Sequence, residues 1–241
     1  MIDELLLLSK NDIPFIEAQV NIHQPTIKEI SLIGEEKFFT GCQFLNFNKN
    51  QLSEEDKEKL RDKTDFDVLM ILMHSAEQRK YRDSAISLLT LLFPDYEVKL
   101  ESSEIILLGS SGVVRLNSGN FNKFKEIIVA MFNIDDSNSS SKSYNPANAR
   151  AAKIAEKFQQ AKMKKNSGKP QKIAIFSRYI SILSVGLQKD MNELLEYSVY
   201  QLKDEFNRYQ KKTYFDACMQ AKMLGAKNLE EIDNWMDDIH S

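Results

Sequence analysis

The pattern of apolar and polar positions is clearest near the C-terminal end of the chain. Residues 192–227 are typical of one long, charged, amphipathic helix, with Asp190 as its N-cap and Glu193 at the capping-box position. Its apolar-face positions lie alternately four and three residues apart: Leu195, Val199, Leu202, Phe206, Tyr209 and Thr213. This spacing places all of them on one helical face. We therefore predict that this face packs against a second helix, at 173–187, in a small bundle.

The N-terminal part of the chain mixes strand and helix patterns. Apolar residues alternate over residues 14–22, which predicts a strand. Thr26 and Glu29 have capping-box spacing and predict a helix that continues toward Phe44. Further helices are predicted after Ser53 and at 65–78, 82–93 and 120–132. Short β-rich runs follow one another at 96–100, 104–108 and 113–116, and a Gly-Ser-Ser-Gly turn between the last two predicts a hairpin.

These patterns predict an α+β N-terminal domain, made of helices with a few short antiparallel strands, followed by an all-α C-terminal helical domain. The polar, serine-rich residues 135–143 have nothing to bury and are typical of a flexible linker. We place an α+β domain at 1–134, a flexible and basic linker that contains a helix at 135–172, and a helical domain at 173–241.

Charge is unevenly distributed along the chain, although the formal net charge is only −3. Residues 135–172 hold 9 Lys and Arg against 3 Asp and Glu. Eight cations form a candidate electrostatic segment: Arg150, Lys153, Lys157, Lys162, Lys164, Lys165, Lys169 and Lys172. Cations in such a segment could neutralise phosphates, but Phe158 is its only aromatic residue, so it lacks an interleaved stacking platform. A solvated linker is the favoured interpretation, with binding to nucleic acid or to an acidic protein surface as alternatives.

Residue patterns that would indicate catalysis or metal binding are missing from the sequence. No two of the histidines His23, His74 and His240 have the spacing of a helical ligand pair, and none lies near a cysteine. The turn at 109–112 lacks the lysine and the following helix of a phosphate-binding loop. Cys42 and Cys218 are predicted to be buried apolar groups. We expect no enzymatic activity, no cofactor and no metal, and no stretch is apolar enough to predict a membrane span.

Aromatic residues are concentrated in the last 45 positions of the chain: Tyr197, Tyr200, Phe206, Tyr209, Tyr214, Phe215 and Trp235. Some of them must bury one another in the helical bundle, but so small a bundle cannot cover all of them. Tyrosine and tryptophan side chains left at a surface are typical anchors for a protein partner. We call the face from Leu195 to Thr213 the inward stripe. The aromatic residues outside it are predicted to bind a partner, chiefly Tyr197, Tyr200, Tyr214 and Trp235.

Four segments of the C-terminal region form a distinctive pattern: Tyr200-Gln201-Leu202, Asp204-Glu205-Phe206-Asn207-Arg208, Leu224-Gly225-Ala226 and Trp235. In these segments the region resembles that of tail assembly chaperones from long-tailed bacteriophages. In the third segment Leu224 replaces the first of three small residues. Residues 24–30 and 35–39 are similar to N-terminal segments of this group, and the middle of the chain is unmatched.

The resemblance implies a non-enzymatic protein that binds the tape-measure protein, tail-tube subunits, or both, during tail morphogenesis. Such a chaperone acts in the host cytoplasm, is absent from the mature virion, and can form a homo-oligomer. Two other functions stay open: nucleic-acid binding through residues 150–172, and a structural tail or baseplate component of the virion.

Overall fold

The structure is a computed structural model that describes residues 2–110, 112–133, 174–225 and 234–236. The chain begins with the short helix α1 (Glu4–Leu8), which Asp3 caps, and a small hairpin of β1 (Ile13–Phe15) and β2 (Val20–Ile22). The sequence predicted one strand here. Instead, a 3-10 turn (Ile16–Ala18) and a left-handed residue, Gln19 (φ 53°), reverse the chain. The reversal lets the buried residues of both strands pack into the same core.

Helices make up most of the N-terminal region. They are α2 (Ile27–Ile33), α3 (Glu35–Leu45), α4 (Glu54–Lys59), α5 (Asp65–His74), α6 (Arg79–Leu92) and α7 (Phe121–Phe132). The Thr26–Glu29 capping box is confirmed at the start of α2, and Ser53 caps α4. The helix predicted to run from Thr26 toward Phe44 is divided in two, since Gly34 has a φ of 88° that suits glycine and ends α2.

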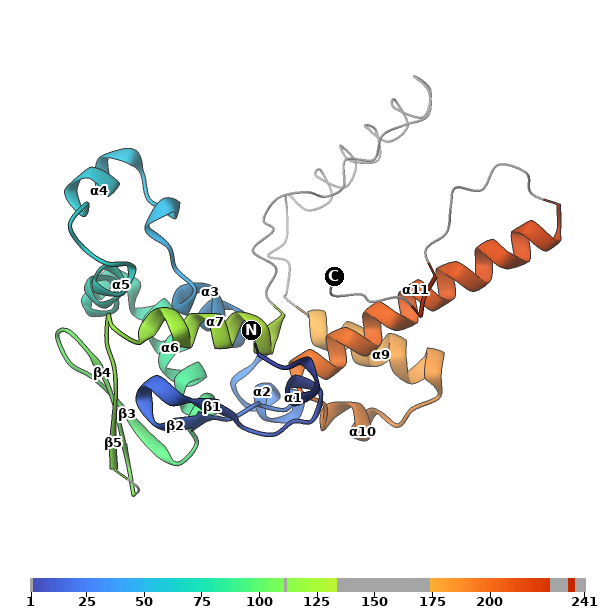
Figure 1. Ribbon diagram of the computed structural model, residues 1–241, viewed down its shortest axis with the longest axis horizontal. Helices are drawn as coiled ribbons and strands as arrows, with labels where there is room; N and C mark the ends of the chain where they lie inside the picture. The colour runs from blue at the N-terminus through green and yellow to red at the C-terminus, as the bar shows by residue number, and fades with distance from the viewer. Residues whose placement is uncertain (1, 111, 134–173, 226–233, 237–241) are drawn as a thin grey trace.

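The predicted late β unit is a three-stranded antiparallel sheet. Its strands are β3 (Tyr96–Leu100), β4 (Ile105–Gly109) and β5 (Gly112–Leu116), in the order β3-β4-β5. Gly109 pairs with Gly112 at the β4–β5 turn, which confirms the predicted hairpin. The sheet lies at the end of the molecule farthest from the C-terminal helices (Figure 1).

The C-terminal region consists of α9 (Ile175–Leu187), α10 (Met191–Leu195) and α11 (Val199–Met223). It contains no strand among the residues that are described. With the helices and small antiparallel sheets of the N-terminal region, it confirms the predicted fold class. The linker predicted at 135–172 lies outside the described residues.

The single helix predicted over 192–227 is wrong in one respect, because the chain breaks between α10 and α11. Asp190 caps only α10, whereas Ser198 begins α11 with its own capping box to Gln201. The break coincides with a tertiary contact. The backbone N–H of Ile27 donates to the Tyr197 carbonyl oxygen (2.9 Å), and Ser198 forms a β-bridge with Thr26. Gly225 (φ 93°) follows the end of α11, as predicted.

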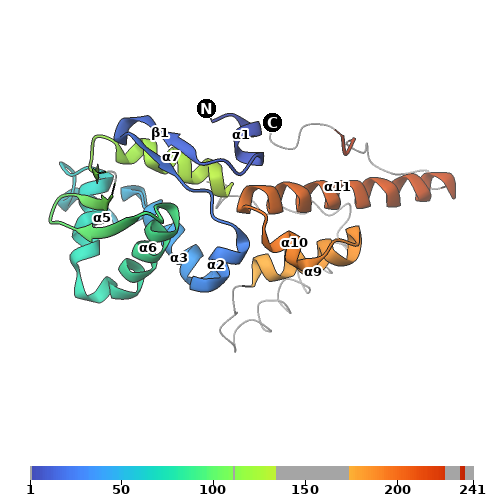
Figure 2. The same cartoon turned by 90° about the horizontal axis from the view of Figure 1, so that it is seen from below.

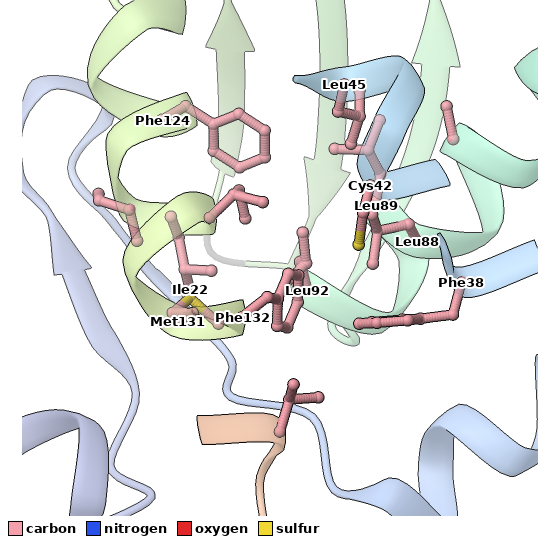
Figure 3. Packing of buried hydrophobic residues seen from close by; sticks show 14 of the residues in the cluster. Ile22, Phe38, Cys42, Leu45, Leu88, Leu89, Leu92, Phe124, Met131 and Phe132 are labelled. Carbon is pink, nitrogen blue, oxygen red and sulfur yellow. The ribbon is translucent and has the colours of Figure 1, made fainter. Parts of the chain in front are cut away.

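One hydrophobic core extends through both regions. In the N-terminal region α7 packs opposite α3 and α6, with Phe38, Leu88, Phe124 and Phe132 among the buried side chains (Figure 3). The same cluster continues into the first half of α11 and into α9 through a further set of buried residues: Phe176, Ile180, Leu183, Leu194, Val199, Tyr200, Leu202 and Phe206. The described C-terminal helices are therefore packed onto the N-terminal region.

Candidate partner-binding surface

Helix α9 is fixed at its N-terminus by an acid from the N-terminal region. The Glu35 carboxylate, at the start of α3, accepts hydrogen bonds from the backbone N–H groups of Phe176 (3.2 Å) and Ser177 (3.0 Å) and from the Ser177 hydroxyl (2.8 Å). The first N–H groups of a helix have no partner within the helix, and a negative charge there complements the helix dipole. Glu35 therefore acts as a remote cap.

In a second remote cap, a side chain from the C-terminal region caps a helix of the N-terminal region. The Lys203 ammonium on α11 donates to the carbonyl oxygens of Phe132 and Asn133, both at 2.9 Å, at the C-terminus of α7. A cation is favourable at that end of a helix. Close by, the Gln201 side chain donates to the Leu8 carbonyl oxygen (2.6 Å), which ties α11 to α1. These contacts fix the direction of α11 relative to the N-terminal region.

The first half of α11 packs on α9. Val199, Leu202 and Phe206 are buried, and the Phe206 ring stacks on Tyr179 with a centroid distance of 3.8 Å. Gly186 lies so close to Tyr209 that an added Cβ would come within 2.2 Å of the tyrosine oxygen. The predicted inward stripe is thus confirmed for these α11 residues but is wrong at Thr213, which is exposed.

The C-terminal part of α11 extends past the end of α9 (Figures 1 and 2). Tyr214 is 62% exposed and Leu224 is 89% exposed. With Ala217 and Ala221 they follow a spacing of three, four and three residues, so they share one helical face. We call these four residues the distal seam. Small and large apolar residues at this spacing are the pattern of a helix that packs on another helix.

Of the four predicted partner-binding residues, Tyr214 alone belongs to the distal seam. Trp235 is partly buried, and Lys212 lies over its ring at 5.9 Å from the centroid. Tyr200 is only 5% exposed and its hydroxyl donates to Glu4 (3.2 Å). Its predicted surface position is therefore wrong, because α1 covers it, and nothing in the local sequence indicates that contact.

Tyr197 is half-buried and lines a cavity of about 420 Å³ beside α11. Its hydroxyl lies 2.6 Å from the Lys189 ammonium, which also donates to Glu205 (2.6 Å). Burial disfavours the charge on Lys189, but the hydrogen bonds to Glu205 and Tyr197 outweigh it and raise the pKa of Lys189. Burial also raises the pKa of Tyr197. Tyr197 is thus held in a polar network that is internal to the protein.

The sequence missed the other members of the distal seam. The inward stripe drew attention to the face that ends at Thr213, whereas the seam begins on a different face at Tyr214. The three-four-three spacing of Tyr214, Ala217, Ala221 and Leu224 was the signal that could have identified it. The candidate electrostatic segment at 150–172 lies outside the described residues.

The described histidines have structural partners. His23 lies between the carboxylates of Asp12 (3.1 Å) and Glu29 (3.3 Å), and His74 contacts the Met70 carbonyl oxygen (2.8 Å). His240 is outside the described residues. Within the described ranges there is no group of three or more His, Cys, Asp or Glu side chains that could hold a metal ion. None of the described helices is both long and apolar enough to span a membrane.

Comparison with known proteins gives one family match. Residues 163–240 match a family described as the YomV second domain. This family is phage-derived, since YomV is a protein of a Bacillus phage, and the match indicates a phage protein. It covers 78 of the 241 residues, counted from 163 to 240, and therefore concerns α9 to α11 but not the N-terminal region. Neither the curated proteins nor the solved structures give a match.

Proposed function

We propose that this phage protein is a tail assembly chaperone without enzymatic activity, which binds a helical client through the distal seam. The observation that carries the proposal is the seam, three of whose four residues are exposed, on a helix that extends past the end of α9 (Figure 2). Exposed apolar residues at helical spacing suit a helix as partner, because a second helix can bury them at close range. The resemblance to tail assembly chaperones supports the tape-measure protein as the client, with tail-tube subunits as a second partner.

The rigid base of α11 supports the same proposal. Glu35 and Lys203 fix α9 and α11 to the N-terminal region, so the distal part of the helix is presented in a defined direction. A preorganised helix loses less conformational entropy when it binds than a flexible segment does. The chaperone would work in the host cytoplasm and leave before the virion is complete.

Co-expression with the tape-measure protein of the same phage tests the proposal. We expect the two proteins to co-purify and the client to become more soluble. Leu224→Lys should weaken the complex at least about tenfold, since it places a charge in an apolar contact. Leu32→Lys is the matched control, because Leu32 is 84% exposed on α2, far from the seam, and should leave binding unchanged.

Three outcomes would contradict the proposal. The first is that neither co-purification nor a gain in client solubility occurs. The second is that both lysine variants bind as well as the unaltered protein, which would exclude the seam. The third is detection of the protein in purified virions by mass spectrometry, which would support a structural tail or baseplate component instead.

A further inference from the structure

A polar cavity lies in the N-terminal region, far along the chain from the distal seam. It has a volume of about 570 Å³ and is formed between α7, the segment after α3 and the start of α5. Four of its eight lining residues are asparagines: Asn46, Asn48, Asn50 and Asn122. A volume of this size is within the range of small-molecule sites. The proposed chaperone function makes no use of this cavity.

The walls of the cavity are linked to one another. The Lys125 ammonium on α7 donates to the Phe47 carbonyl oxygen (2.8 Å) and lies 3.9 Å from the Asp65 carboxylate. Asp65 in turn accepts from the backbone N–H of Lys49 (3.2 Å). These contacts join α7, the segment after α3 and the N-terminus of α5. The backbone segments that carry the asparagines are therefore fixed before any ligand enters, while their amide groups keep their hydrogen-bonding capacity.

The amide groups themselves are free to bind. Among the residues that the structure describes, the side chains of Asn46, Asn50 and Asn122 have no hydrogen-bond partner, and Asn48 uses only its oxygen, to cap Asn50 (2.9 Å). Each asparagine amide offers two donors and an acceptor oxygen. The cavity thus presents several neutral groups that can donate and accept at the same time.

The remaining lining residues exclude several classes of ligand. Val129 is the one apolar residue in the lining, so an apolar ligand would find little surface to bury. Lys125 is its one cation and is already held by Phe47 and Asp65, which disfavours phosphate or nucleic acid. The second acid, Glu126, pairs with Lys123 (2.8 Å), so the cavity has no strong excess of either charge.

We propose that this cavity binds an uncharged, hydroxyl-rich ligand, of the class of a mono- or disaccharide. A sugar hydroxyl both donates and accepts, and two neighbouring hydroxyls match the donor and acceptor of one asparagine amide. The Asp65 carboxylate can accept from a further hydroxyl, and such hydrogen bonds to a charged group are stronger than neutral ones. The cavity lacks an aromatic ring on which a sugar could stack, so binding is weak and depends on the amides.

Nuclear magnetic resonance of the full-length, ¹⁵N-labelled protein tests this proposal. The probes are glucose, N-acetylglucosamine, cellobiose and chitobiose, each titrated to about 50 mM because millimolar affinity is expected. The side-chain NH₂ signals of Asn46 and Asn122 should shift in a saturable manner with at least one of the four. Asn122→Ala should weaken this binding about fivefold, as expected for loss of one or two hydrogen bonds.

Asn192→Ala is the matched control, since Asn192 is exposed on α10 and outside the cavity, and it should leave the affinity unchanged. Asn122 is exposed on α7, and alanine is a good helix former there, so the variant should remain folded. The proposal is overturned if none of the four saccharides shifts these signals. It is also overturned if sodium phosphate or spermidine shifts them instead, or if both variants bind equally well.

Discussion

The remote cap made by Lys203 gives the most direct test of how the C-terminal helices are attached. Lys203→Met removes the ammonium but keeps a flexible apolar side chain of similar length. The variant loses the two 2.9 Å hydrogen bonds to the carbonyl oxygens of Phe132 and Asn133. It also removes a positive charge from the C-terminus of α7.

The structure sets the size of the expected effect. A hydrogen bond to a charged group contributes about 1.5–3 kcal/mol, and a cation at a helix C-terminus adds about 0.3–1 kcal/mol. Lys203 is half-buried, so water can reach the carbonyl groups in the variant and replace part of this energy. We therefore expect the free energy of unfolding to fall by about 2–3 kcal/mol, which is less than the sum of two such hydrogen bonds and the helix-terminus contribution.

Urea unfolding followed by circular dichroism measures this change. With a slope of about 2–3 kcal/mol/M, the midpoint should fall by about 1 M. Lys222→Met is the control, because Lys222 is exposed on the same helix and its side chain forms no hydrogen bond or ion pair among the described residues. Surface substitutions of that kind change stability by less than about 0.5 kcal/mol. If the two variants unfold at the same urea concentration, the reasoning about the remote cap is refuted.

Three further predictions follow from particular contacts. Gly186→Ala should destabilise the protein by about 1–3 kcal/mol in the same urea assay, because the added methyl group overlaps Tyr209, and an unchanged midpoint would contradict this. Burial would raise the pKa of Glu29, but hydrogen bonds to its carboxylate lower the pKa overall. The contribution of Glu29 to folding stability is therefore present above the unfolded pKa of about 4.3 and is lost as the pH falls through the folded pKa. Glu29→Gln should accordingly flatten the decline of stability with acid, and an unaltered pH profile would count against this assignment. Burial raises the pKa of the Cys42 thiol, so in a Cys218→Ser variant a thiol reagent should label Cys42 only after urea is added, and rapid labelling without urea would be inconsistent with its burial.

Much of the fold could be predicted from the sequence because it depends on neighbours along the chain. The capping box of Thr26 and Glu29, the polar helix after Ser53 and the β4–β5 hairpin were all predicted and are present. Each involves residues within a few positions of one another. The inward stripe of α11 was also predicted through Phe206, since its period alone defines a face.

The candidate site was less predictable. Tyr214 was predicted to be a surface residue and is exposed, but Tyr200 is covered by α1 and Tyr197 is held by Lys189. Aromatic side chains at a helix surface look alike in sequence, whether another element covers them or not. Their exposure depends on which helices pack against them. Tyr200 is covered by α1, and its hydrogen-bond partner Glu4 lies almost 200 residues away in the sequence.

The sequence by itself determined the kinds of elements, several of their caps and the absence of a recognisable catalytic motif. These features follow from local periodicity and from hydrogen bonds between near neighbours. Only the tertiary structure decided that the chain breaks at Ser198, where Thr26 and Ile27 pair with the backbone. It also decided that α11 continues beyond α9 (Figure 2), with three of the four seam residues exposed. The physical reason is that a helix face is buried or exposed by what packs against it, and that packing is set by the whole fold.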